Sequence, residues 1–366
     1  MMLFTATTMF AQDENLYIFL CFGQSNMEGQ GKIETQDYTV DSRFQVLQAV
    51  TCGNLRRTKG VWYTATPPLC RAYTGLCPVD YFGRTMVANL PSNIRVGVVN
   101  VSVAGCKIEL FDKDKYQAYA LTVPSWMTGI INEYGGNPFA HLVEIAKLAQ
   151  KDGVIKGILL HQGESNTGDN AWPSKVKKVY SDLIAALNLD SSKVPLLAGE
   201  VVNADQGGVC AGANAMIAKL PQTLPNSYVI SSKGCTDTTD NIHFNSAGYR
   251  ELGKRYAVKM LSLLGVEVTA VQRTESVGSE GYLLRQNYPN PFNPSTTISF
   301  SLPSRSFVTV KIYDALGREI AQVLSEELPS GNHSRQWQPN GIASGIYFYR
   351  LQAGTYAETR MLQLLK

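Results

Sequence analysis

The chain has 366 residues, which is long for one average domain and fits one large domain followed by a smaller one. Hydrophobic residues make up 44% of it and charged residues 17%, so it can build a core and does not have the composition of a disordered protein. The net charge of +3 comes without a long basic run, which argues against a nucleic-acid partner, and no apolar run of about 18 residues predicts a transmembrane segment.

The N-terminal stretch "MMLFTATTMFAQDEN" is apolar and ends in a small residue before a polar run. This pattern predicts that residues 1–11 are the remainder of a secretory signal peptide, cleaved after Ala11. A basic segment is missing, so a disordered start, or a start codon assigned too late, is the alternative. In an exported protein the seven cysteines can form disulfides. The candidates for pairing are Cys52, Cys70 and Cys77 in one segment and Cys210 with Cys235 in another, with Cys21 or Cys106 left as a thiol.

Residues 13–265 alternate short apolar runs with amphipathic ones. The predicted strands are 16–22, 94–103, 154–161, 195–202 and 228–231. The predicted helices are 139–150, 175–187, 213–220 and 247–264, the last with Ser246 as its N-cap. This order favours an α/β fold in which helices cover both faces of a parallel sheet. In such folds ligands bind beyond the carboxyl ends of the strands.

The character of the chain changes near Val266. Residues 266–281 are polar and glycine-containing, which predicts a linker. Residues 282–366 contain short β-type runs separated by turn residues such as "DALGRE", which predicts a small antiparallel all-β sandwich. This part has no cysteine and only His333 as a histidine, so it offers little for catalysis.

Ser25 stands in "GQSNMEG", directly after the first predicted strand. A serine at this position presents its hydroxyl at the edge of the sheet and its backbone N–H to a developing anion. Gln24 and Asn26 are expected to hold the turn in place. Because a serine is a weak nucleophile, it needs a base, and the base needs a group that orients it.

Three histidines lie in the larger domain. His141 falls inside a predicted helix, where a packing role is the simpler interpretation, and His161 ends a buried strand. His243 lies in "DNIHFNSAG" with Asp240 three residues before it, a spacing at which a carboxylate can fix the tautomer of the imidazole. Taken alone, this spacing is common and equally suits loop residues that cap a helix.

Four sequence blocks taken together are a more specific signal than the Asp–His spacing alone: "GQSNMEG", "NVSVAG", "HQGESN" and "DNIHFNSAGY". They resemble the sequence blocks of the SGNH hydrolase superfamily, and within it the acetylxylan esterases of carbohydrate esterase family 6 and the related sialate O-acetylesterases. The resemblance covers about residues 15–262. It implies a flavodoxin-like three-layer α/β/α fold and Ser–His–Asp catalysis without a metal or another cofactor.

The resemblance implies a role for each residue of the catalytic group. Ser25 becomes the nucleophile, His243 the general base and Asp240 the residue that orients it. Glu164 in "HQGE" is the alternative acid, because a glutamate at this position of the family can assist the histidine. A buried glutamate must in either case be hydrogen-bonded or lie near charge.

The same resemblance implies an oxyanion hole. Its donors are the backbone N–H groups of Ser25 and Gly105, together with an amide side chain from the third block. Gln162 is the first choice for that amide and Asn166 the second, although both could instead satisfy loop backbone. Loop aromatics are candidates for a sugar platform, or for ordinary loop anchoring: Trp62, Tyr63, Tyr73, Trp126 and Trp172.

The C-terminal runs "NYPNPFNPSTTISFSLP", "KIYDALGRE", "GIYFYRLQAG" and "MLQLLK" resemble the type A C-terminal sorting domain of the type IX secretion system, over about residues 283–366. This implies contact with the type IX secretion machinery and export, followed by release or attachment at the cell surface. A spacer or carbohydrate-binding sandwich is the alternative.

The sequence therefore predicts a secreted carbohydrate O-acetylesterase that acts on acetylxylan or another acetylated glycan. A sialate O-acetylesterase or another SGNH esterase is the alternative within enzymes. A surface-displayed glycan-binding protein without catalysis is the alternative from another class.

Overall fold

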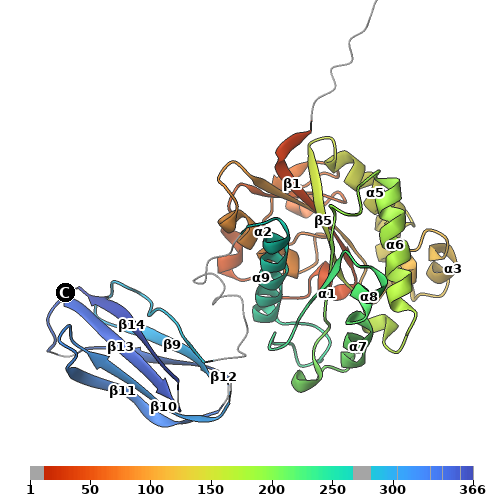
Figure 1. Cartoon of the computed structure of the whole chain (residues 1–366). Coiled ribbons are helices and arrows are strands. Elements are labelled where there is room, and N and C mark those ends of the chain that lie inside the picture. The colour runs from red at the N-terminus through yellow and green to blue at the C-terminus, as the bar shows by residue number, and fades with distance from the viewer. Residues whose placement is uncertain are drawn as a thin grey trace, which may run out of the picture. The chain divides into compact units, whose positions relative to one another are not determined.

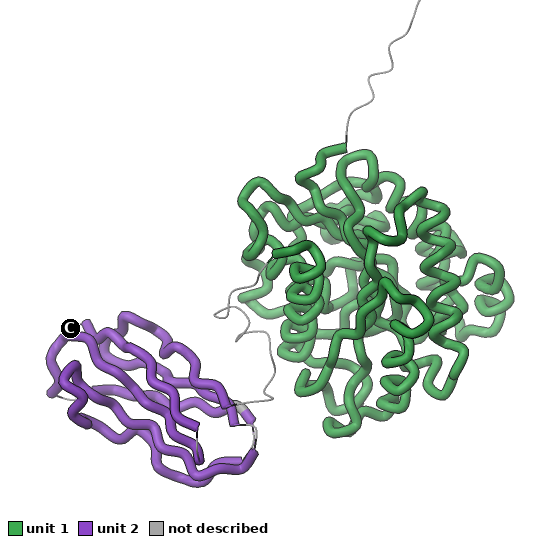
Figure 2. The backbone as a smooth tube through the Cα atoms, in the orientation of Figure 1, with its two compact units in different colours: residues 1–276 green, residues 277–366 purple. Residues whose placement is uncertain are grey.

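The computed structural model describes residues 12–266 and 282–365, apart from residues 303, 330, 340 and 355. The chain forms two compact units, residues 1–276 and residues 277–366, which Figure 2 distinguishes by colour. The predicted signal remnant at 1–11 lies outside the described residues, and so does the predicted linker at 266–281 apart from Val266. Within the described residues, no helix is long and apolar enough to cross a membrane.

The first unit contains a seven-stranded sheet in the order β3-β2-β4-β1-β5-β6-β7. The strands are β1 (Asp13–Gly23), β2 (Phe44–Leu47), β3 (Trp62–Thr64), β4 (Arg95–Ser102), β5 (Gly153–His161), β6 (Leu196–Gly199) and β7 (Ser227–Ile230). All neighbours are parallel except β3, which runs antiparallel to β2 at one edge. The five predicted strands all lie in this sheet, and β2 and β3 are two short strands that the sequence analysis did not predict.

Helices cover both faces of this sheet (Figure 1). The helices are α2 (Pro78–Asn89), α5 (Pro138–Ala149), α6 (Trp172–Ala186) and α9 (Ser246–Leu263). Ile18, Leu20 and Phe22 of β1 pack in the same core as α5 and α6, whereas Phe19 and Cys21 pack in the core of α2 and α9. This alternation along a strand buried on both sides confirms the three-layer α/β/α fold.

Three local predictions need correction. The predicted helix at 213–220 is two short helices, α7 (Asn214–Ile217) and α8 (Leu220–Thr223), because Pro221 has no N–H to continue the first one. The N-cap of α9 is Asn245, whose side chain accepts the N–H of Gly248 at 3.0 Å, and Ser246 is the first helical residue. The seven cysteines are free thiols, six of them buried as small apolar groups, so the expected disulfides are not formed.

The second unit is an all-β sandwich with its own core. One sheet has the order β11-β10-β13-β14 and the other β12-β9-β8, with antiparallel pairing in both. The strands are β8 (Leu283–Leu284), β9 (Thr296–Leu302), β10 (Ser306–Tyr313), β11 (Glu319–Leu328), β12 (Gly331–Trp337), β13 (Gly345–Ala353) and β14 (Tyr356–Leu364). The run "DALGRE" turns the chain between β10 and β11, as predicted, and inward-facing aliphatic and aromatic side chains fill the space between the sheets.

The carboxyl ends of the three central strands of the first unit bring the sequence blocks together. Gly23 at the end of β1 pairs with Ser102 of β4 on one side and with His161 of β5 on the other. Gly23 has a φ of +155°, and a Cβ atom there would lie 2.1 Å from the carbonyl oxygen of His161. Only glycine therefore lets the chain turn so close to β5 and place the next residues at this edge.

Candidate active site

Ser25, His243 and Asp240 form a continuous hydrogen-bonded line. Ser25 is the first residue of the short helix α1 (Ser25–Glu28), and its Oγ lies 2.8 Å from Nε2 of His243. His243 lies in the loop before α9, and its Nδ1 lies 2.7 Å from Oδ2 of Asp240. The three side chains, which come from two separate sequence blocks, are thus in contact in the order that a nucleophile, a base and an orienting acid would require.

Asp240 is held as a carboxylate. Its Oδ1 accepts the backbone N–H groups of Ile242 and His243 at 2.9 and 3.0 Å and the hydroxyl of Thr238 at 2.7 Å. Partial burial acts to raise the pKa of Asp240, but the hydrogen bonds from His243, Ile242 and Thr238 together hold it well below its ordinary value. A fixed carboxylate at Nδ1 keeps the proton on that nitrogen and leaves Nε2 free to accept one from Ser25.

Glu164 lies in a different environment. It is buried, its Oε1 accepts an N–H from Nδ2 of Asn26 at 2.5 Å, and that same oxygen lies 3.7 Å from Nε2 of the fully buried His161. Burial raises the pKa of Glu164 despite the bond from Asn26, and burial lowers the pKa of His161 to about 3. Among the described residues, Glu164 makes no hydrogen bond to His243, so the two candidate acids occupy distinct positions.

Asn26 connects the serine turn to the histidine loop. Its Nδ2 donates to the carbonyl oxygen of Ile242 at 2.9 Å, and its Oδ1 accepts the N–H of Phe244 at 3.3 Å and the hydroxyl of Tyr249 at 2.7 Å. Ile242 and Phe244 are the two neighbours of His243. A single buried amide, next in the chain to Ser25, therefore holds the loop of His243 on both sides of this histidine.

Gly105 lines the same cavity as Ser25 and His243. This cavity has a volume of about 340 Å³ and is also lined by Trp126, Glu164 and other residues. Gly105 has a φ of +70°, and a Cβ there would lie 2.9 Å from the ring of Trp126, so the backbone approaches the cavity closely only as glycine. In the described part of the chain, its N–H has no hydrogen-bond acceptor, which leaves it available to a ligand.

Gln162 and Asn166 lie behind this cavity and do not line it. Nε2 of Gln162 donates to Asn166 Oδ1 at 2.7 Å and lies 3.2 Å from the carbonyl oxygen of Cys106, while its Oε1 accepts from the indole of Trp172 at 2.5 Å. Asn166 Oδ1 accepts the N–H of Ile108 at 2.9 Å. Either amide would have to leave these partners to reach an oxyanion, so in this structure both support the loops that carry Cys106 and Ile108.

A buried ion pair under the site was not found by sequence reasoning. Arg71 donates to the carboxylate of Glu28, three residues after Ser25, and to the carbonyl oxygen of Ser102 at 3.1 Å. Glu28 also accepts the N–H of Ala104 at 3.2 Å. The pair thus fastens the serine turn to the loop that carries Gly105. Its partners are far apart in the sequence, and no local pattern indicated it.

Of the five aromatic residues predicted as a sugar platform, only Trp126 lines this cavity. Trp126 lines the cavity and is 55% exposed, whereas Trp172 is fully buried. Trp62 donates its indole N–H to Asp152, which precedes β5 and so lies at the opposite, amino-terminal edge of the sheet. Tyr63 accepts the N–H of Thr58 and does not line the cavity, and Tyr73 is exposed beside Arg71.

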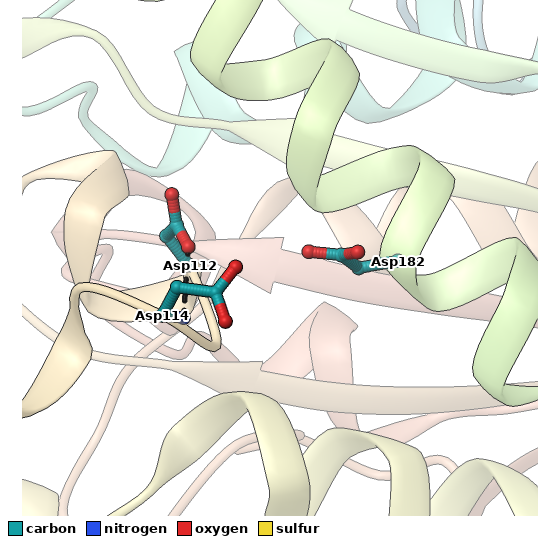
Figure 3. A group of neighbouring side chains, drawn as sticks. All are labelled: Asp112, Asp114 and Asp182. Atoms are coloured by element: carbon teal, nitrogen blue, oxygen red, sulfur yellow. Dashed lines mark hydrogen bonds between the residues drawn. The ribbon is translucent and has the colours of Figure 1, made fainter.

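One cluster of carboxylates in the described residues has a spacing that could suit a metal ion: Asp112, Asp114 and Asp182 (Figure 3). Nζ of Lys178 lies 2.9, 2.7 and 2.8 Å from an oxygen of each of them in turn. The ammonium group of Lys178 already lies within hydrogen-bond distance of all three carboxylates, and we assign no metal to the cluster.

Comparison with known families decides the identity of both units. Residues 15–262 match the family described as carbohydrate esterase, sialic acid-specific acetylesterase. The chain belongs to this family. Its first unit is therefore that of a carbohydrate esterase, and the family supports an esterase that acts on acetylated sugars. Residues 286–364 match the secretion system C-terminal sorting domain, which points to secretion and cell-surface attachment.

Two distant relatives of this carbohydrate esterase show the extent of the match. A probable carbohydrate esterase of Arabidopsis thaliana is 23% identical over 261 residues, which cover 67% of this chain and 90% of the plant protein. The crystal structure of this same Arabidopsis thaliana protein superposes with a TM-score of 0.53 at 22% identity, covering 68% of this chain and 98% of that one. The crystal structure of NanS gives a TM-score of 0.51 at 15% identity, covering 70% and 99%. These structures support the fold.

Proposed function

We propose that this protein is an extracellular carbohydrate O-acetylesterase that uses Ser25 as its nucleophile. The observation that carries the proposal is the line from Ser25 Oγ through His243 to Asp240, with distances of 2.8 and 2.7 Å, on the wall of a cavity. Family membership supports the substrate class, an acetylated sugar. The sorting domain supports export by the type IX route and attachment or release at the cell surface.

The reaction begins when Nε2 of His243 takes the proton of Ser25 Oγ while Oγ bonds to the acetyl carbonyl carbon. The carbonyl electrons move to its oxygen, where the N–H groups of Ser25 and Gly105 stabilise the charge. As the tetrahedral intermediate collapses, the bond to the sugar oxygen breaks and that oxygen takes the proton from His243. The sugar leaves as an alcohol, and the acetyl group stays on Ser25.

A water molecule then completes the cycle. His243 takes one proton from the water, whose oxygen attacks the acetyl-enzyme carbonyl. Collapse releases acetate and returns the proton to Ser25 Oγ. Asp240 stays ionised throughout and balances the imidazolium that forms twice in each turnover. Every side chain and backbone group that acts in these two half-reactions belongs to the chain itself.

The test is acetate release by the full chain, wild type beside Ser25→Ala. The substrates are p-nitrophenyl acetate, acetylated xylan, acetylated mannan and O-acetyl sialic acid. We expect Ser25→Ala to lower turnover on the order of 10⁴-fold or more, because the nucleophile is lost. Ser25-dependent release from a sugar substrate would establish the esterase. If a folded wild type released acetate from none of these, the surface-displayed glycan-binding protein would be the better interpretation.

A further inference from the structure

A second, larger cavity lies at the same edge of the sheet as the catalytic one. Its volume is about 490 Å³, and its polar lining includes Thr51, Lys59, Asn132, Glu133, His141 and Glu144. Thr51 and Lys59 belong to the loop that follows β2, and β2 runs parallel to β4 and β1. The loop after β2 therefore leaves the sheet at its carboxyl edge, where the loops carrying Ser25 and Gly105 also begin.

The helix α4 (Ser125–Glu133) connects the two cavities. Trp126 near its start lines the catalytic cavity, and Glu133 at its end lines the second one. Seven residues of α-helix separate them, which is about 10 Å at 1.5 Å per residue. This separation is the length of a short oligosaccharide, so one extended ligand could occupy both cavities.

An exposed aromatic ring contacts the residue that ends this helix. Tyr73 is 66% exposed, yet its hydroxyl donates to the carboxylate of Glu133 and its ring stacks with the guanidinium of Arg71, whose carbon lies 5.2 Å from the ring centre. Arg71 is itself buried and bound to Glu28, so Tyr73 is anchored to the base of the active site. A ring that is both exposed and held in place can stack on a flat apolar surface, such as a sugar face, without losing much side-chain entropy.

The polar groups of the second cavity suit a neutral, hydroxyl-rich ligand. Lys59 lies 2.8 Å from Glu144, so the positive charge in the cavity is already paired. Nε2 of His141 lies 2.7 Å from the carbonyl oxygen of Ala49, which makes Nε2 the donor and leaves Nδ1 as an acceptor. The lining mixes donors and acceptors, with Lys59 beside Glu133 and Glu144, and has no cluster of positive charge, which disfavours an anion as its ligand.

We infer that Tyr73 and the second cavity form a sugar-binding subsite next to the catalytic cavity, and that the enzyme acts on acetyl groups of an oligosaccharide or polysaccharide chain. This inference rests on the proposed function. The acetylated unit lies at Ser25 beside Trp126, and neighbouring units of the same chain lie over Tyr73 and in the cavity of Lys59 and His141. A free acetylated monosaccharide would leave this subsite empty.

The test measures kcat/KM of the full-length protein on acetylated xylo- and manno-oligosaccharides of increasing length, on O-acetyl sialic acid and on p-nitrophenyl acetate. For wild type we expect kcat/KM to rise with oligosaccharide length on at least one backbone. Tyr73→Ala should lower kcat/KM on the longer substrates roughly 5- to 10-fold, chiefly through KM, and leave p-nitrophenyl acetate unchanged. Tyr73→Phe keeps the ring and should retain most of the length dependence.

Ala140→Trp provides a second variant that removes no contact. Ala140 lines the second cavity and is exposed at the start of α5, so a large ring there fills the cavity and should abolish the length dependence. Tyr38→Ala is the matched control, because Tyr38 is similarly exposed at 57% and, like Tyr73, lines neither cavity, but among the described residues it makes no hydrogen bond or cation–π contact with Glu133 or Arg71. It should behave as wild type.

Two results would overturn the inference while leaving the esterase intact. One is a wild type that cleaves O-acetyl sialic acid but gains nothing from oligosaccharide length. The other is a Tyr73→Ala variant whose kcat/KM falls equally on short and long substrates. A wild type without Ser25-dependent hydrolysis of any of these substrates would instead contradict the proposed function itself.

Discussion

The site contains two histidine–carboxyl pairs with the same three-residue spacing and opposite electrostatics. His243 and Asp240 are 24% and 47% exposed in their side chains, and their nearest atoms are 2.7 Å apart. His161 and Glu164 are 0% and 3% exposed, and their nearest atoms are 3.7 Å apart. In the first pair the acid has a lowered pKa, whereas in the second the acid has a raised pKa and the histidine a lowered one.

The difference shows that solvent exposure and backbone hydrogen-bond donors, more than the spacing in the sequence, decide the direction of the pKa shifts in such a pair. Asp240 accepts two backbone N–H groups and a hydroxyl in addition to the imidazole, which together outweigh its partial burial. Glu164 has the single short bond from Asn26, which does not offset full burial. The exposed pair is therefore suited to carry separated charge, whereas burial favours the uncharged form of each member of the buried pair.

Asp240→Asn should have the largest effect of the changes to these pairs. The amide keeps the size of the carboxylate but can no longer fix the tautomer or balance the imidazolium. We expect kcat on p-nitrophenyl acetate to fall on the order of 1000-fold. Steady-state kinetics of purified protein measures this, with circular dichroism as a check that the variant is folded.

Glu164→Gln is the matched change in the other pair. It should lower kcat less than about tenfold, because among the described residues Glu164 makes no hydrogen bond to His243. If Glu164→Gln instead cost more than Asp240→Asn, the role of orienting acid would pass to Glu164.

Asn26→Ala breaks the connection between the two pairs. Asn26 binds Glu164 on one side and the loop around His243 on the other, so its loss frees the base to move relative to Ser25. We expect kcat to fall about 10- to 100-fold with KM little changed, because misplacement of a base affects the chemical step more than binding. The same steady-state assay on an acetylated substrate measures both constants.

Tyr249→Phe serves as the control for Asn26→Ala. It removes one hydroxyl from Asn26 Oδ1 and leaves the bonds to Ile242 and Phe244 in place. Its kcat should stay within a few-fold of wild type. A Tyr249→Phe defect as large as that of Asn26→Ala would mean that packing around α9, and not the hold on the base loop, explains the loss.

Sequence reasoning reached furthest where a feature has a local or block-wise pattern. Long apolar runs identified the central strands, and the blocks singled out Ser25, Asp240 and His243, which the structure brings into contact although Ser25 and His243 are 218 residues apart. It did not predict β2 and β3, since strands of four and three residues carry too little periodicity. It predicted Gln162, or else Asn166, as an oxyanion donor, and the structure places both amides behind the cavity. The direction of an amide side chain cannot be predicted from a sequence block, because the fold orients it.

Sequence patterns also did not predict contacts between residues that lie far apart along the chain. Arg71 and Glu28 are 43 residues apart, and nothing in either segment marks them as partners. Lys178 meets Asp112 and Asp114 only because α6 packs beside the loop that follows β4. Such pairs depend on the tertiary arrangement, which propensity and periodicity do not encode.

Glu164→Gln should also change how stability depends on pH, and this is the smallest expected effect. His161 has a folded-state pKa near 3 against 6.5 for an ordinary histidine, so acidification below 6.5 favours the unfolded chain, which binds the proton. Glu164 has a raised pKa against an ordinary 4.5, so it binds a proton in the folded state that the unfolded chain has lost. Between 4.5 and the raised pKa of Glu164, each state of the wild type holds one proton on this pair, and its contribution to stability is flat.

The variant loses the compensating proton. When glutamine replaces Glu164, the folded state binds no proton at either position. In the unfolded chain His161 still binds a proton below a pH of about 6.5. The free energy of unfolding should therefore fall by about 1.4 kcal/mol for each pH unit below that value relative to wild type, within that interval. Urea denaturation of both proteins at about pH 7, 6 and 5 measures the difference, and the double variant with His161→Gln should abolish it. Parallel pH curves for wild type and Glu164→Gln would mean that Glu164 is ionised in the folded protein, and the two pairs would then differ in geometry but not in charge.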